Sequence, residues 1–74
     1  MKQRIRELLE SSLPIVDLDS EFLFTELDSL GVMTILMLLS EEFGIRLDAS
    51  DATPKNFKTL DSIVMLVENK LANN

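Results

Sequence analysis

A chain of 74 residues that contains no cysteine can hold a fold together only with one apolar core. Disulfides are excluded, and a structural zinc site is not expected because histidine is also absent. Apolar residues make up 46% of the sequence, which is enough for a compact domain and unlike the composition of disordered segments. We therefore expect residues 1–74 to form a single domain.

The side chains that are missing also restrict the chemistry of this chain. It has no His, Cys, Trp or Tyr, so no imidazole is present to act as an acid or base near neutral pH. A Ser–His or Cys–His nucleophile pair is excluded for the same reason. A domain this small also offers little room for a cleft that keeps water away from a reaction. The sequence therefore indicates a protein that is not itself an enzyme.

The net charge of −6 argues against nucleic acid as a partner, because phosphate binding requires a basic surface. It favours basic protein partners instead. Residues 1–4 carry positive charge, but no apolar run of signal-peptide length follows them. The longest apolar-rich stretch, residues 30–39, is far shorter than the roughly 20 residues that span a bilayer. We expect a soluble cytoplasmic protein without membrane insertion.

Apolar spacing predicts an amphipathic first helix over residues 2–13, which Pro14 ends. Its apolar face carries Ile5, Leu8, Leu9 and Leu13. Residues 14–28 then form an unusually long connection, and such connections in compact domains are often functional. We expect an ordered loop with room for one short turn, held to the core by apolar side chains. These side chains are Leu18, Phe22, Leu23, Phe24 and Leu27.

The second helix is predicted to begin at Asp28 or Ser29 and to end at Phe43, where Gly44 supplies a stop. Asp28 is a good N-cap, since its carboxylate can accept hydrogen bonds from the free amides of the first turn. Helical periodicity places one set of residues toward the core: Val32, Met33, Ile35, Leu36, Leu39 and Phe43. The opposite face carries Leu30, Gly31, Thr34, Met37, Leu38 and Glu41. That face is too apolar for ordinary solvent exposure, so we expect something to contact it.

The last third of the chain contains two further helix starts. Thr53 and Pro54 are typical of an N-cap and a first helical residue, and they predict a short helix that runs to about Phe57. Thr59 is expected to cap the final helix. The core stripe of that helix is expected to contain Ile63, Leu66, Val67 and Leu71. The sequence thus predicts an all-α fold, a small four-helix bundle with three main helices, one short helix and a long first loop.

The segment that carries chemistry is Leu27-Asp28-Ser29-Leu30-Gly31, where a serine stands at the point at which the long loop enters an apolar helix. Free amides and the positive end of the helix dipole suit a covalently attached phosphate at this place. Ser29 has no adjacent base, so it cannot be an activated nucleophile in its own right. It can still be the substrate of another enzyme that activates it. A purely structural interpretation makes Asp28 and Ser29 only a capping pair.

The sequence resembles the acyl carrier protein family over nearly the whole chain. The family's Asp-Ser-Leu motif stands at Asp28, Ser29 and Leu30, and the letters SEEFG at residues 40–44 are similar to the end of its second helix. Length, acidity, helix order and the long first loop match as well. The resemblance implies that Ser29 takes a 4'-phosphopantetheine arm from coenzyme A. The thiol of that arm would carry acyl groups as thioesters between enzymes of fatty acid, lipid, polyketide or related biosynthesis.

The resemblance also implies where partner proteins bind. Asp28, Leu30, Met37 and Glu41 match positions at which partner enzymes contact the second helix of the family. The partners implied are a phosphopantetheinyl transferase and enzymes that load and process acyl groups, and we expect a monomer. Between residues 17 and 42 there are seven acidic residues and no basic one, and five of the seven stand at or before Asp28. Packing against the long loop is the alternative explanation for Leu30 and Met37.

Other functions remain open on the sequence alone. Peptidyl carriers usually have glycine and histidine before the serine, whereas Leu27 and Asp28 stand here and favour an acyl carrier. Aminoacyl and D-alanyl carriers also use Asp-Ser. A third alternative is an unmodified acidic helical module that binds a partner helix through Leu30, Met37 and Leu38.

Overall fold

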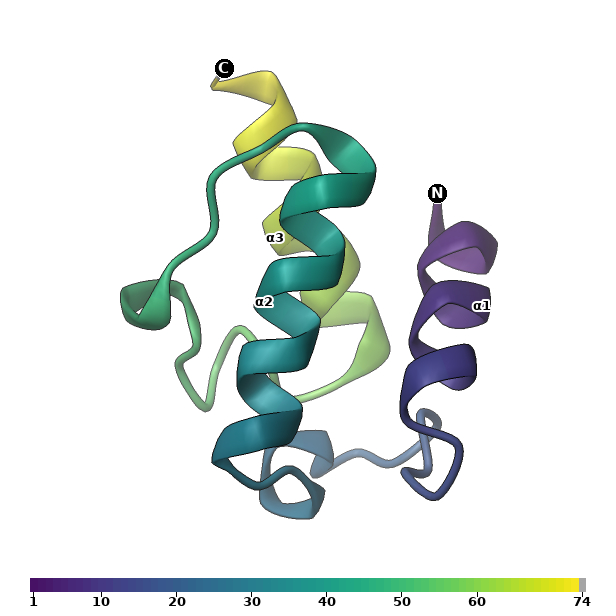
Figure 1. The fold of residues 1–74 in the computed structure, drawn as a ribbon. Coiled ribbons are helices and arrows are strands. Elements are labelled where there is room, and N and C mark those ends of the chain that lie inside the picture. The colour runs from purple at the N-terminus through teal and green to yellow at the C-terminus, as the bar shows by residue number, and fades with distance from the viewer. Residues whose placement is uncertain (74) are drawn as a thin grey trace.

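The computed structural model describes residues 1–73, which form three α-helices and no strand (Figure 1). Helix α1 spans Lys2–Ser12, α2 spans Ser29–Phe43 and α3 spans Leu60–Ala72. Two short 3-10 helices lie in the connections, η1 at Leu23–Glu26 and η2 at Ala49–Asp51. The all-α prediction and the three main helices are confirmed, and η1 is the short turn expected in the first loop.

The long connections follow from the directions of the helices. In Figure 1, α1 runs downward, whereas α2 and α3 both run upward, and every pair of these helices is in contact. The chain must therefore cross the lower end of the bundle to enter α2. It must then return along the full length of α2 before α3 can begin. The start of α2 lies at the end of the bundle where the first connection arrives.

The core draws on the three helices and on both connections. Its side chains are Leu, Ile, Val and Phe, and eight of them are fully buried. These eight are Ile5, Leu9, Leu23, Ile35, Leu39, Phe57, Ile63 and Val67. Two of them, Leu23 and Phe57, come from the connections. The expectation that apolar side chains pin the first loop to the core is therefore confirmed at Leu23, and also at the buried Leu18.

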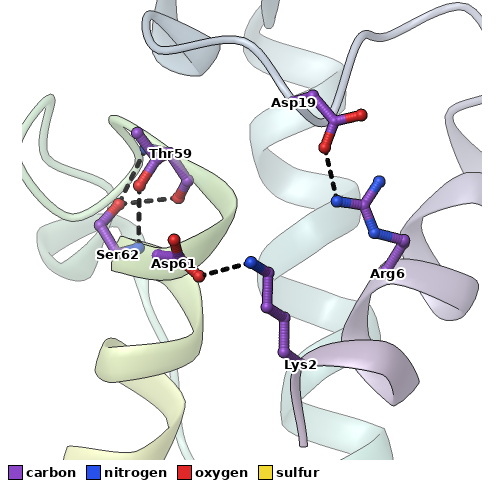
Figure 2. A network of polar contacts seen from close by, with 6 residues as sticks. All are labelled: Lys2, Arg6, Asp19, Thr59, Asp61 and Ser62. Atoms are coloured by element: carbon purple, nitrogen blue, oxygen red, sulfur yellow. Dashed lines mark hydrogen bonds and ion pairs between the residues drawn. The ribbon is translucent and has the colours of Figure 1, made fainter.

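Helix ends are formed as the sequence predicts. Gly44 ends α2 in the left-handed conformation with φ of 61°, which glycine adopts without steric cost. Thr59 caps α3 by accepting a hydrogen bond from the Ser62 amide at 3.1 Å. The Ser62 hydroxyl in turn accepts from the Thr59 amide at 3.0 Å (Figure 2). It also lies 2.7 Å from the Asn56 carbonyl, to which it can donate. Thr59 and Ser62 form a reciprocal capping box.

The short helix expected at residues 53–57 is wrong. Thr53 does start a turn, since its hydroxyl accepts from the Asn56 amide and its carbonyl accepts from the Phe57 amide at 3.0 Å. The turn does not continue, because Thr59 already caps α3 two residues after Phe57. A single helical turn fixes several backbone dihedrals for one hydrogen bond, and no room is left to extend it.

Three apolar side chains expected in the core are exposed instead: Phe22, Met33 and Leu71. Gly31, expected on the opposite face of α2, is buried. Phe22 precedes η1, and it is the neighbouring Leu23 that enters the core. Leu71 lies in the last turn of α3, where little protein remains to cover it. The error at Met33 concerns the orientation of α2 and bears directly on the site.

Ion pairs tie α1 to three other parts of the chain. Lys2 Nζ lies 2.9 Å from an Asp61 carboxylate oxygen on α3, and Arg6 Nη2 lies 2.6 Å from Asp19 Oδ1 on the first loop (Figure 2). Arg4 contacts Glu42 near the end of α2 through both Nε and Nη2, at 2.8 and 2.6 Å. All three pairs are solvent-accessible, so each contributes only modestly to stability. Within residues 1–73, no helix has the length and apolar character needed to cross a membrane.

Candidate functional site

Ser29 is the first residue of α2 and its side chain is exposed. Asp28 precedes it in extended conformation, with φ of −92° and ψ of −179°, and acts as the N-cap. The Asp28 carboxylate accepts a hydrogen bond from the Gly31 amide at 2.7 Å, and the Asp28 carbonyl accepts from the Val32 amide at 3.0 Å. The predicted cap is confirmed. Ser29 is therefore the first helical residue, and its hydroxyl lies on the exposed side of the first turn.

The first loop fixes the position at which α2 begins. The Leu23 amide donates to the Lys58 carbonyl at 2.8 Å, which fastens η1 to the segment that leads into α3. Leu27 follows η1 with an amide hydrogen bond to the Phe24 carbonyl at 3.3 Å, and its half-buried side chain packs against the core. The chain turns from η1 into α2 within Leu27 and Asp28. Ser29 is therefore held on a defined support although it is exposed itself.

Gly31 has a structural role that sequence analysis missed. It is buried, and a Cβ at this position would lie 3.3 Å from Asp28 Oδ1 and 3.4 Å from Leu27 Cδ2. A side chain here would crowd the carboxylate that caps the helix. The sequence contained a signal for this role. Gly31 is the third residue of the helix that Asp28 caps, and the amide at that position commonly donates to the side chain of the N-cap residue.

The residues predicted to contact partners are all exposed. Leu30 is 75% exposed and Met37 is 54% exposed, while Asp28 and Glu41 are also on the surface. The alternative that the long loop covers Leu30 and Met37 is therefore wrong. Met33, which was expected in the core, is 58% exposed. Spacings of three and four residues place Leu30, Met33 and Met37 along one side of α2, and we call these three residues the apolar stripe.

A hollow of about 340 Å³ opens beside Ser29. Its wall on α2 includes Ser29, Val32 and Met33, and its opposite wall includes Ala49 and Ala52 from the connection that leads to α3. A second hollow of about 300 Å³ lies between the end of α1 and the first turn of α2, where Leu13 and Gly31 are among its lining residues. The serine therefore stands beside mostly apolar space.

A family model described as phosphopantetheine attachment site matches residues 1–67 of this sequence. The chain belongs to this family of phosphopantetheine-binding carrier proteins. Searches of curated proteins and of solved structures found no match. Membership implies a covalently attached 4'-phosphopantetheine cofactor and a carrier role. Carrier domains of this kind are generally not catalytic, are modified by a phosphopantetheinyl transferase and interact with acyl-processing enzymes.

The start of α2 in this carrier protein fits a phosphate-linked group. The amides of Ser29 and Leu30 have no acceptor within the helix, because they lie in its first turn. The Asp28 side chain accepts a hydrogen bond from the Gly31 amide and leaves these two amides free of it. The helix dipole adds positive potential at the same place. The negative charge of the Asp28 carboxylate opposes this positive potential. The hydrogen bond that the carboxylate accepts from the Gly31 amide partly neutralises that negative charge. No side chain has to move to expose the hydroxyl.

Acidic residues are concentrated in the connection that leads into α2 of this carrier protein. The acids at residues 17, 19, 21 and 26 all belong to the connection that precedes Asp28. Only Asp19 among them has an ion-pair partner within residues 1–73, namely Arg6. The hydrogen bond from Arg6, followed by its positive charge, lowers the pKa of Asp19 below the ordinary value. The connection that precedes Ser29 is therefore strongly acidic.

Proposed function

We propose that this chain is an acyl carrier protein, which holds acyl intermediates as thioesters on a 4'-phosphopantetheine arm attached to Ser29. It would pass them between enzymes of fatty acid, lipid, polyketide or related biosynthesis. The observation that carries this proposal is the position of Ser29, an exposed hydroxyl at the first residue of an α-helix in a chain of the phosphopantetheine attachment family.

Comparison with the other serines supports the choice of Ser29. Ser11 donates to the Glu7 carbonyl, Ser50 donates to Asp48, and Ser62 is held in the capping box of α3. Ser12 is exposed as Ser29 is, but it lies at the C-terminal end of α1, where the helix dipole is unfavourable for a phosphate. Among residues 1–73, Ser29 alone combines exposure with the N-terminal end of an α-helix.

The division of labour between chain and arm follows from the composition. When attached, the arm supplies the thiol that the cysteine-free chain lacks. The chain presents the Ser29 hydroxyl and holds the helix start through Asp28. It offers no imidazole to remove the proton from that hydroxyl, so the transferase must supply the base. In this proposal the chain is a substrate and carrier and is not an enzyme, and it functions as one domain and as a monomer.

The proposed partner surface runs along α2 from the serine. Asp28, Leu30, Met37 and Glu41 are exposed on this helix. Acids flank the apolar stripe at the start of α2 and at Glu41, which suits partners with a basic rim around an apolar centre. The occupants proposed are the phosphopantetheinyl transferase and the acyl-loading and acyl-processing enzymes. Leu27 and Asp28 before the serine support an acyl carrier over a peptidyl carrier, while aminoacyl and D-alanyl carriers, which also use Asp-Ser, are the alternatives.

Mass spectrometry of the modification reaction tests the proposal. The bare protein is incubated with coenzyme A and a phosphopantetheinyl transferase of broad specificity and is then weighed. We expect one phosphopantetheine to be added to the natural chain and to the Ser12→Ala variant, and none to the Ser29→Ala variant. Circular dichroism shows whether each variant is folded. A folded natural chain that gains no mass, or a gain that persists in Ser29→Ala, would refute attachment at Ser29. Mass analysis of the protein from its native cell then identifies the acyl group.

A further inference from the structure

The methionines of this protein are all on its surface. Met1, Met33, Met37 and Met65 are 46%, 58%, 54% and 61% exposed, whereas the buried apolar side chains are Leu, Ile, Val and Phe. The chain has no Cys, His, Trp or Tyr. The thioether sulfurs are therefore its readily oxidised side-chain groups, and all four belong to exposed residues.

Two of these methionines lie on the same face of the same helix, beside the attachment serine. Met33 and Met37 are four residues apart in α2 and belong to the apolar stripe that begins at Leu30. Met33 also lines the hollow of about 340 Å³ that Ser29 borders. Met65 has a similar exposure but lies on α3.

We propose that Met33 and Met37 form an oxidation site through which hydroperoxides weaken docking of the phosphopantetheinyl transferase on α2. This inference rests on the proposed attachment at Ser29. The thioether sulfur attacks the outer oxygen of the hydroperoxide and forms the S–O bond while the O–O bond breaks. The sulfur is oxidised by two electrons to the sulfoxide. The hydroperoxide is reduced to an alcohol, or to water when it is hydrogen peroxide, because the proton of the transferred outer oxygen moves to the departing oxygen.

Oxidation should weaken docking because the transferase has to cover the surface that contains these two methionines. An enzyme that delivers a group to the Ser29 hydroxyl has to approach the first turns of α2, where the apolar stripe offers the contact area nearest to that hydroxyl. A sulfoxide turns a flexible apolar side chain into a strongly polar one, which resists burial in an interface. Both side chains are exposed and neither takes part in the core or in a helix cap, so oxidation leaves the core and the helix caps in place. Methionine sulfoxide reductases can reverse the change.

The test compares peroxide-treated and untreated bare protein. The chain is exposed to hydrogen peroxide before it meets coenzyme A, and the peroxide is removed with catalase so that no pantetheine thiol is oxidised. Peptide mapping locates each sulfoxide, and circular dichroism checks the fold. The KM of the transferase for the protein is then measured in the natural chain, in the double variant Met33→Leu, Met37→Leu, and in the control Met65→Leu. The ratio of treated to untreated KM is the readout.

We expect sulfoxides at Met33 and Met37 and a rise in KM of roughly tenfold, the factor that corresponds to losing the burial of about one methionine side chain. The rise should occur in Met65→Leu, disappear in the double variant and be reversed by the reductases. Failure to oxidise Met33 and Met37, oxidation without a rise in KM, or a rise that persists in the double variant would overturn the inference. If the untreated natural chain accepts no arm, the proposed function is refuted, and the docking inference with it.

Discussion

The carboxylate of Asp28 and the backbone amide of Gly31 form a hydrogen bond of 2.7 Å that closes the first turn of α2. The same aspartate stands next to Ser29, the proposed attachment site. Its side chain therefore stabilises the helix start, and it also belongs to the proposed partner surface.

Substitutions at Asp28 can separate these two roles. Asp28→Ala removes the cap and should lower the free energy of unfolding by about 1 kcal/mol, whereas Asp28→Asn keeps a capping oxygen and should cost much less. Urea unfolding of both variants measures the difference. If Asp28→Asn is nearly as stable as the natural chain but raises the transferase KM, the negative charge itself contributes to docking. Equal stability of Asp28→Ala and the natural chain would contradict the capping role.

Leu30 should matter for docking and little for folding, because it is 75% exposed. We expect Leu30→Ala to leave the urea midpoint nearly unchanged and to raise the transferase KM by roughly fivefold, through lost apolar burial in the complex. Met65→Ala removes an exposed side chain from α3 instead and should leave KM unchanged. Similar KM values for all three proteins would count against the apolar stripe as a docking surface.

The Ser62 hydroxyl joins three parts of the backbone at the start of α3. Its oxygen accepts from the Thr59 amide, and its single proton is shared between the Thr59 and Asn56 carbonyls, whose oxygens lie 2.8 and 2.7 Å from Ser62 Oγ. Ser62→Ala leaves these half-buried groups without that partner and should lower the free energy of unfolding by about 1–2 kcal/mol. Ser62→Thr retains a hydroxyl and should recover part of the loss. Thermal unfolding that is unchanged in Ser62→Ala would show that water replaces the hydroxyl without cost.

The ion pair between Arg6 and Asp19 should leave a signature at acid pH. The hydrogen bond and charge of Arg6 lower the pKa of Asp19 from its ordinary value of 3.8. A carboxyl group with a depressed pKa stabilises the fold above its unfolded pKa, and that contribution is lost as pH falls through the folded value. Arg6→Gln should therefore bring the pKa of Asp19 back toward 3.8, and its stability should converge with that of the natural chain in acid.

Titration of the carboxyl groups by NMR measures this shift directly. Asp48 serves as an internal control, because its pKa is lowered chiefly by hydrogen bonds from Ser50 and should be unaffected by Arg6→Gln. An unchanged pKa for Asp19 in the variant would show that the ion pair does not persist in solution.

Gly44 is the residue at which a single methyl group should be costly. Its φ of 61° lies in the left-handed region, so Gly44→Ala should lower the free energy of unfolding by about 1 kcal/mol even though the space around it is open. Gly44→Asn should be milder, since asparagine tolerates this conformation better. Urea unfolding of the pair separates backbone strain from steric crowding. Equal losses in both variants would contradict the argument from conformation.

The sequence predicted what local chemistry determines. The caps at Asp28 and Thr59 and the stop at Gly44 are local signals, and all three are found where they were expected. The prediction of a short helix at residues 53–57 was wrong because Thr53 and Pro54 indicate where a helix can begin but not how long it is. The buried Phe57 and the nearby cap at Thr59 limit it to one turn, and these depend on tertiary packing and on the next helix.

The orientation of α2 was predicted only in part, for a different reason. Ile35, Leu36 and Leu39 are buried as expected, but Met33 is exposed. Because apolar residues surround most of this helix, periodicity alone cannot determine which side is buried. The spacing of Met33 from Leu30 and Met37 was the available clue. Methionine and leucine are equally apolar in a pattern, so only packing distinguishes the covered residues from the apolar stripe.

The place of Ser29 in α2 has a consequence for how the bare and loaded proteins relate. Its amide is one of those that a helix start leaves without an internal acceptor, and its hydroxyl has no hydrogen-bond partner within residues 1–73. A substituent on that oxygen breaks nothing that maintains the fold. With the arm on Ser29 as proposed, the bare and modified proteins should therefore keep the same fold and share one melting temperature.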